Sequence, residues 1–264
     1  AQRLVRAKRK IREAHIPFTV PGLSELPARL QDVLRVVYLI FNEGYASATH
    51  ADHVRTHLCD EALHLVKLLE ELMPGEPEVA GLYALILFHH ARRSTRIDAV
   101  GDPILLQDQD RTMWDVRKTL DGVTILDRAL RHGNLGQYQV EAALAAEHAR
   151  ARTWEETNWF RIREWYDRLM ELAPSPIVEL NRAVAVAYTD GNAAGLAAID
   201  EAAKDDALKD YLQFYVARAE LLRRLDRPAE AAQHYRQALE RSQSQAERRH
   251  IGKKLSELRV DGFA

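Results

Sequence analysis

The sequence predicts an all-α protein in which antiparallel helical hairpins stack into a solenoid. Ala, Leu, Arg and Glu dominate the 264 residues, whereas Gly (12) and Pro (9) are scarce and lie between periodic segments. The abundant residues lose little rotamer freedom in a helix. No segment shows the alternation with a period of two that is typical of a strand. A repeat in the C-terminal third, described below, adds the solenoid to the helix prediction.

Helix start and stop signals divide the N-terminal half. Ser24 precedes a helix expected over 27–44, with Pro27 in its first turn. The next helix, 52–72, carries apolar residues on one face, stepping by four and three, and ends before Met73-Pro74-Gly75. A third begins near residue 77 and is apolar on most sides.

Two C-terminal segments, 179–203 and 215–239, match at a constant offset. The matched residues are 36 apart: Ala183 and Ala219, Gly195 and Ala231, Ile199 and Tyr235, Ala202 and Ala238. A repeat in this length range indicates a helical solenoid, because each unit buries its apolar face only against its neighbours.

The second copy resembles a tetratricopeptide repeat, with small Ala219, Ala231 and Ala238 and an aromatic Tyr235. Five helix pairs are predicted, followed by a polar capping helix at 245–258. The pairs are 27–44 with 52–72, 77–96 with 112–132, 136–150 with 155–172, 176–189 with 192–204, and 210–225 with 228–241. The second pair is interrupted by 97–111, which is long for a helix–helix connection and therefore a candidate functional loop.

The bulk composition excludes several classes of protein. A net charge of −2 argues against wholesale nucleic-acid binding by this segment. A single cysteine, Cys59, rules out an internal disulfide framework, favours the reducing cytoplasm and is expected to be a buried small hydrophobe. No apolar stretch is long enough for a membrane span, and no signal peptide is expected.

The first fourteen residues are strongly basic. Six cations stand against one acid, and on charge alone they are either a solvated helix or the end of a helix that contacts DNA phosphates. The cations proposed for the phosphate contacts are Arg3, Arg6, Lys8, Arg9 and Lys10.

RLVRAKRKIREAHIPFTVP resembles the end of the region 4 helix-turn-helix in extracytoplasmic-function sigma factors that carry a long C-terminal extension. LPARLQDVLRVVYLIFNEGYAS, LCDEALHL, LQDQDRTMWD and SPIVELNRAVAVAYTDG resemble motifs of that extension, so the resemblance covers nearly the whole chain.

The resemblance implies a protein that, when intact, directs RNA polymerase to promoters. Residues 1–14 would be a remnant of the DNA-recognition helix, 15–26 a linker and 27–264 the extension. Regions 2 and 4, RNA polymerase and a small regulatory protein are the implied partners, and promoter DNA would be contacted only through regions missing here. The isolated extension is predicted not to start transcription, and it is predicted to be no enzyme and to hold no cofactor or metal.

The stretch FNEGY ends the first buried helix. Gly44 is predicted at the position after the helix in the left-handed conformation, with Asn42 satisfying loose carbonyls. Glu43 is expected to pair with Arg55 or a neighbouring arginine, and Tyr45 to pack its ring and hydrogen-bond through its hydroxyl. The alternatives are a catalytic carboxylate and a contact surface for the rest of the factor.

Two further groups of residues each have two interpretations. His53, His57, Glu61 and His64 share one helix face and would suit Zn²⁺ or iron, but a solvated face is the simpler interpretation. At the end of the inserted loop, Asp108 or Asp110 is predicted to cap the next helix and pair with Arg111, with Gln109 and Trp114 alongside. The alternative is a loop that touches region 4, polymerase or a partner.

Three functions therefore stand as hypotheses. The first is a regulatory interaction domain of a sigma factor, with the concave solenoid face and the 97–111 loop as contact surfaces. The second is a free-standing tetratricopeptide scaffold for extended peptides. The third is a metal-dependent enzyme built on the histidine stripe. The direction of regulation, the signal, the partner, the promoter and the oligomeric state do not follow from the sequence.

Overall fold

The computed structural model describes residue 13, residues 25–46 and residues 57–258. Within these residues the chain forms eleven α-helices and no strand, which confirms the all-α prediction. The helices are α2 (Leu26–Ala46), α3 (His57–Leu72), α4 (Pro77–Ala91), α5 (Val116–Leu130), α6 (Gln137–Arg150), α7 (Trp159–Leu172), α8 (Pro176–Thr189), α9 (Asn192–Ala202), α10 (Leu212–Arg224), α11 (Pro228–Arg241) and α12 (Gln245–Glu257).

The chain divides into two compact units, Ala1–Val36 and Val37–Ala264. In the first unit, the described part is mainly the beginning of α2, where Arg29 and Glu25 form an exposed ion pair at 3.5 Å. The predicted boundaries at residues 14 and 26 stay a prediction, because 14–24 lie outside the described residues. The packing below concerns the second unit alone.

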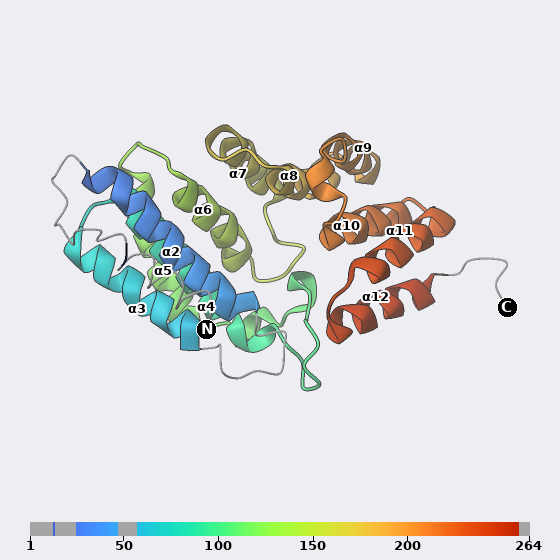
Figure 1. Ribbon diagram of the computed structural model, residues 1–264, viewed down its shortest axis with the longest axis horizontal. Coiled ribbons are helices and arrows are strands. Elements are labelled where there is room, and N and C mark those ends of the chain that lie inside the picture. The colour runs from blue at the N-terminus through green and yellow to red at the C-terminus, as the bar shows by residue number, and fades with distance from the viewer. Residues whose placement is uncertain (1–12, 14–24, 47–56, 259–264) are drawn as a thin grey trace. The chain divides into compact units, whose positions relative to one another are not determined.

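Consecutive helices of the second unit pack against one another as hairpins (Figure 1). The predicted offset of 36 residues recurs between the helix starts. α8 and α10 start at Pro176 and Leu212, and α9 and α11 start at Asn192 and Pro228. All eight matched residues are buried. They form one continuous core that runs from Leu180 to Ile251.

Small residues set how closely these helices approach. A Cβ on Gly195 would lie 2.3 Å from the Cβ of Ala187 in the paired helix, and a Cβ on Gly81 would lie 2.6 Å from the backbone nitrogen of Gln139. Such distances are far below van der Waals contact, so only glycine permits the α8–α9 and α4–α6 crossings as they stand.

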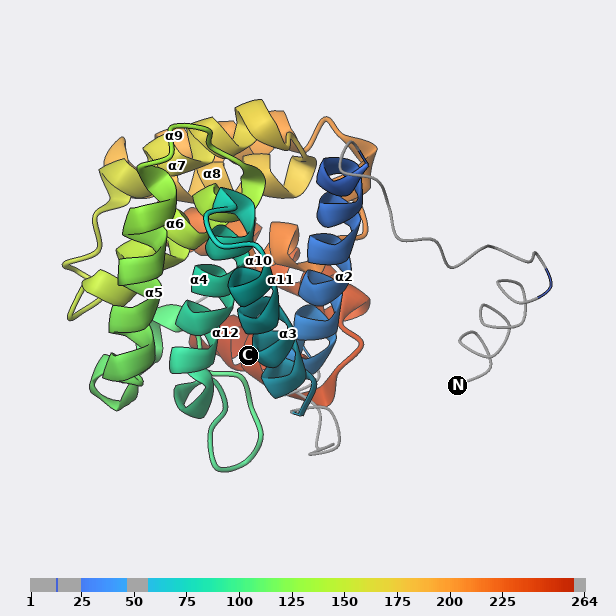
Figure 2. The ribbon, with the colours of Figure 1, turned by 90° about the vertical axis from the view of Figure 1, so that its left-hand side faces the viewer.

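The packing of α4 explains why its sequence is apolar on most sides. It contacts α3, α5 and α6 together, and ten of its fifteen residues are buried (Figure 2). Glu78 in its first turn accepts hydrogen bonds from the backbone N–H groups of Tyr138 (3.1 Å) and Gln139 (3.0 Å). A carboxylate of one hairpin thus caps the first helix of the next, where the helix dipole favours a negative charge.

Four helix starts carry capping side chains. The backbone N–H groups of the first turns are accepted by Asp115 for α5, Asn158 for α7, Ser175 for α8 and Ser244 for α12. Each cap satisfies a donor that has no partner within its helix. Cys59 is buried, as predicted. No described helix combines the length and apolar character that crossing a bilayer requires.

Candidate partner-binding groove

A largely apolar groove of about 480 Å³ lies along the C-terminal hairpins. Its floor comes from the first helices of the last two hairpins, α8 and α10, and from the capping helix α12. One wall is the inserted loop, and Trp154 from the connection before α7 completes the lining. The loop residues that line the groove are Pro103, Leu105, Leu106 and Gln107; the predicted loop contacts Asp108, Gln109, Asp110, Arg111 and Trp114 do not line it.

The loop is held in place at its base and at its tip. Ile97 and Pro103 form an isolated antiparallel bridge, and the Asp98 carboxylate accepts hydrogen bonds from the N–H groups of Val100 (2.9 Å) and Asp102 (2.8 Å). Asp102 then forms a bidentate ion pair with Arg249 of α12. This pair joins residues 147 positions apart and ties the loop to α12.

One polar region of the groove lies at the C-terminal end of α10. Arg224 donates a hydrogen bond to the hydroxyl of Tyr188 (3.1 Å) and lies over that ring, 5.1 Å from its centroid. It also pairs with Glu220 at 3.0 Å. Burial alone would raise the pKa of Glu220, but hydrogen bonds and charge from Arg223 and Arg224 lower it to about 2. The carboxylate therefore stays ionised, which leaves a fixed ion pair beside apolar walls.

A cluster of aromatic side chains packs against Tyr188. The ring of Tyr188 stacks on Trp159, with centroids 3.9 Å apart and planes 8° apart. Trp154 meets both rings edge-on and stacks on His148. Sequence reasoning did not find Trp154, Tyr188 or Arg224. Tyr188 and Arg224 are 36 residues apart, so the repeat offset itself carried the signal that the two residues would be neighbours.

The DQDR stretch acts as a clasp, with one correction. Asp110 accepts from the N–H of Thr112 (2.9 Å) and caps the short 3₁₀ helix Arg111–Met113. α5 is capped instead by Asp115. Asp108 ends another 3₁₀ turn, Leu106–Asp108.

The predicted pairing of Arg111 with these acids is wrong. Its guanidinium donates to the carbonyls of His148 (2.8 Å) and Ala151 (2.9 Å) at the end of α6. The carbonyls at the end of α6 have no intrahelical donor, and the helix dipole favours a cation there.

Gln109 and Trp114 are buried, not displayed. The Gln109 side chain donates to the carbonyl of Ile104 (3.0 Å), and the Trp114 indole donates to the hydroxyl of Thr95 (3.0 Å). Both hold the loop to the end of α4. They are therefore unsuited to direct partner contact, and among the proposed contact residues the exposed Asp108 and Asp110 remain.

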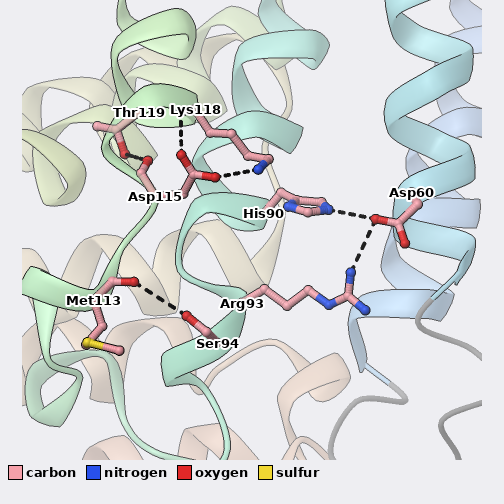
Figure 3. A network of polar contacts seen from close by, with 8 residues as sticks. All are labelled: Asp60, His90, Arg93, Ser94, Met113, Asp115, Lys118 and Thr119. Carbon is pink, nitrogen blue, oxygen red and sulfur yellow. Dashed lines mark hydrogen bonds and ion pairs between the residues drawn. The ribbon is translucent and has the colours of Figure 1, made fainter.

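The end of α4 is fixed by a second set of polar contacts (Figure 3). His90 and Arg93 approach the Asp60 carboxylate of α3 at 2.9 and 3.3 Å. Burial would raise the pKa of Asp60, but the hydrogen bond from His90 and the charge of Arg93 outweigh it and lower that pKa. Nearby, Asp115 caps α5 and pairs with Lys118 at 2.5 Å. His90 and Arg93 thus link two hairpins directly.

FNEGY does not end its helix as predicted. α2 continues to Ala46, so Gly44 is helical and not a left-handed cap. Its lack of a side chain serves packing: a Cβ there would lie 2.8 Å from the backbone nitrogen and 2.9 Å from the Sγ of Cys59 in α3. Asn42 hydrogen-bonds the hydroxyl of Tyr38, one turn earlier, in place of the expected carbonyls.

Tyr45 packs as predicted, but its hydroxyl does not bond as predicted. Its ring stacks on Phe41 at 5.2 Å, meets His89 at 5.1 Å, and lies 3.3 Å from the guanidinium carbon of Arg96. The hydroxyl is buried without a hydrogen-bond partner among the described residues. Glu43 is exposed, and its expected partner Arg55 lies outside the described residues.

The remaining sequence candidates were the histidine stripe and the basic segment. His57, Glu61 and His64 are exposed on α3, as a solvated face requires, whereas His53 lies outside the described residues. In the part of the chain that the structure describes, no three side chains of the metal-ligating kinds are grouped to hold an ion. Arg3, Arg6, Lys8, Arg9 and Lys10 also lie outside it.

Comparison with known proteins finds a family model that matches part of the chain and one similar protein. Residues 29–130, which span α2 to α5, match DUF6596, a family of unknown function. The uncharacterized protein R00370 of Rhizobium meliloti (strain 1021) is 40% identical over 260 residues, 98% of this chain. The chain spans 61% of the length of that relative.

Proposed function

We propose that this chain is the regulatory, protein-contacting extension of an extracytoplasmic-function sigma factor, which directs RNA polymerase to promoters. The motifs that resemble such extensions fall on packing elements: LQDQDRTMWD is the clasp at the end of the inserted loop, and SPIVELNRAVAVAYTDG is α8 with its cap. The groove is the observation that carries the contact role, since hairpin solenoids bind partners along the face formed by their first helices.

The occupant we propose is a segment of the same polypeptide, from the regions that bind DNA or polymerase. The relative is matched over only 61% of its length, so roughly two-fifths of it lies outside the shared part. Such a length would accommodate those regions. The apolar walls and the fixed Arg224–Glu220 pair suit an extended segment with apolar side chains and one polar anchor.

In vitro transcription with the full-length protein tests the regulatory role. The intact factor is compared with a version that ends near Arg12, on the same promoter and with the same polymerase. A changed transcript yield is expected, in either direction. Equal promoter activity from both versions would defeat the proposal.

A point substitution then tests the groove. Gln213 is exposed and lines the groove, so Gln213→Arg obstructs it without disturbing the core. Gln233→Arg is the matched control, because Gln233 is exposed on α11 and lies outside the groove. We expect Gln213→Arg to reproduce the effect of the truncation and Gln233→Arg to leave transcription unchanged. If truncation has no effect but Gln213→Arg blocks binding of a peptide from another protein, the chain is a peptide-binding scaffold.

A further inference from the structure

A second cavity, separate from the groove floor, lies between α4 and α6 and extends to α7 and α8. Its volume is about 410 Å³, which is within the range of small-molecule sites. Two helix stripes face it: Leu85, His89 and Arg92 from α4, and Glu141, Leu144 and His148 from α6. The α6 stripe is polar at both ends and apolar at its middle, whereas the α4 stripe is apolar at Leu85 and polar from His89 onward. The proposed partner contacts use none of these groups.

One end of the cavity is cationic. The Arg92 guanidinium is mostly buried, and its hydrogen-bond partners are neutral: the side chains of Gln109 (3.5 Å) and His89 (3.2 Å). Among the described residues, no carboxylate forms an ion pair with it. A buried guanidinium without a counter-charge is costly, so this end favours an anion.

Two imidazoles line the same end. Burial, and then the charges of Arg111 and Arg92, lower the pKa of His148 to about 3; burial with Arg92 and Arg96 lowers the pKa of His89 as well. Both rings are therefore neutral. The buried Nδ1 of His148 has no hydrogen-bond partner among the described residues, which leaves one more polar atom for an occupant to satisfy.

The other end of the cavity is acidic. Burial raises the pKa of the Glu141 carboxyl, against hydrogen bonds from Gln137 and Tyr38. Burial and the nearby charge of Glu141 raise the pKa of both Tyr38 and Tyr166 to about 12, so both phenols stay protonated. Glu141 is an acceptor in these surroundings and suits a hydroxyl or amine of a ligand.

The distance between the two ends follows from the helix itself. Glu141 and His148 are seven residues apart on α6, which corresponds to about 10 Å at the rise of an α-helix. Between them the lining is apolar and partly aromatic, with Leu144, Phe88 and Leu169. The mouth is marked by Ile177, 44% exposed, and by the exposed Asn181 on α8.

We propose that this cavity binds a small organic acid with an apolar or aromatic body, its carboxylate on Arg92 and a terminal hydroxyl or amine on Glu141. Leu106 of the inserted loop lines both the cavity and the groove, so a bound acid would touch the wall of the partner surface. The proposal concerns binding by this chain and does not depend on the sigma-factor proposal.

Three probes of one shape test the two ends separately. 3-(4-Hydroxyphenyl)propionate has both polar groups, 3-phenylpropionate lacks the hydroxyl, and 4-propylphenol lacks the carboxylate. Ligand-detected NMR on the purified chain should give a Kd on the order of 1 mM for the first, as expected for about twelve non-hydrogen atoms. We expect 3-phenylpropionate to bind severalfold more weakly and 4-propylphenol at least about tenfold more weakly.

Substitution at the mouth locates the binding. Ile177→Trp should close the entrance and raise the Kd of 3-(4-hydroxyphenyl)propionate at least about tenfold. Leu172→Trp is its matched control, since Leu172 is similarly exposed (45%) on α7 and does not line the cavity; binding should be unchanged. Arg92→Met should remove the preference for the carboxylate probes, and circular dichroism checks that this buried substitution preserves the fold.

Three outcomes would overturn the proposal. They are no binding of any probe at about 10 mM, equal binding of the acid and 4-propylphenol, and full binding by Ile177→Trp. The binding assay contains no polymerase, so a failure of the ligand proposal would not affect the transcription test. Likewise, a failure of the sigma-factor proposal would not affect the binding assay.

Discussion

Arg224 lies over the ring of Tyr188, 36 residues earlier, and donates a 3.1 Å hydrogen bond to its hydroxyl. The two residues occupy the same place in successive hairpins, so this contact repeats the period of the solenoid. It also joins the groove surface to the aromatic cluster beneath it, since Tyr188 stacks on Trp159. The contribution of this contact between hairpins to stability can be measured by substituting the two side chains.

A double-mutant cycle tests that contact. Tyr188→Phe removes only the hydroxyl, and Arg224→Met removes only the guanidinium. We expect a coupling of about 0.5–1 kcal/mol in the free energy of urea unfolding, as for a hydrogen bond to a partly exposed charged group. Arg223→Met is the control, because Arg223 also binds Glu220 but does not contact the Tyr188 hydroxyl. Coupling of equal size in the control cycle would contradict a specific Tyr188–Arg224 bond.

Substitution of Gly44 separates packing from helix propensity. Alanine favours a helix by about 0.5–1 kcal/mol over glycine, yet a Cβ at position 44 would lie 2.8–2.9 Å from Cys59 and Leu58. We therefore expect Gly44→Ala to lower the free energy of unfolding by about 1–3 kcal/mol, as overpacking does. Gly252, helical with open space around its Cβ position, is the control. Gly252→Ala should stabilise the protein, and a stabilising Gly44→Ala would refute the packing argument.

Periodicity and repeat spacing were enough to predict the fold. They located the helices to within a few residues. Apolar residues recur every three or four positions on each buried face, and Pro, Gly or a capping residue marks each end. Gly44 shows the limit of such local signals. Its role depends on Cys59, a neighbour in space from another helix, and a glycine near a helix end has the same local sequence in either role.

The candidate sites were harder to predict, for the same reason. Asp102 and Arg249 are brought together only by the stacking of several hairpins. The cavity stripes did have a local signal: Glu141 and His148 lie two turns apart in an otherwise Ala-rich α6, and Arg92 follows Leu85 at the same spacing. Polar residues at helical spacing on a buried face were the pattern to find.

The buried histidines predict that stability falls in mild acid. The pKa of His148 is about 3 in the folded chain, against an unfolded value near 6.5. The unfolded state therefore binds the proton first, so stability is full above pH 6.5 and is lost as pH falls toward 3. Between pH 7.5 and pH 5 this histidine alone accounts for about 2 kcal/mol.

Unfolding in urea at several pH values measures this loss. His89 and, less strongly, His234 and His250 have pKa values lowered by burial and contribute in the same direction. His148→Phe should flatten the pH dependence by about 2 kcal/mol over that range, whereas His64→Phe, at an exposed position, should leave the slope unchanged. A wild-type stability that is constant between pH 7.5 and pH 5 would contradict the neutral burial of His148.

The last prediction concerns the tether of the inserted loop. Arg249 of α12 holds Asp102 in a bidentate pair, while the base of the loop is held by the Ile97–Pro103 bridge. In Arg249→Gln the base should persist and the tip should open more often, because the ion pair between Asp102 and α12 is removed. Hydrogen exchange of the amides of Asp98, Gly101 and Asp102 should accelerate, with little change at Ile104, which bonds the Arg96 carbonyl at the base. Lys253→Gln, at an exposed position of the same helix, is the control for the lost charge. Unchanged exchange in Arg249→Gln would mean that the loop holds its position without the tether, and the groove wall would then be rigid by its own hydrogen bonds.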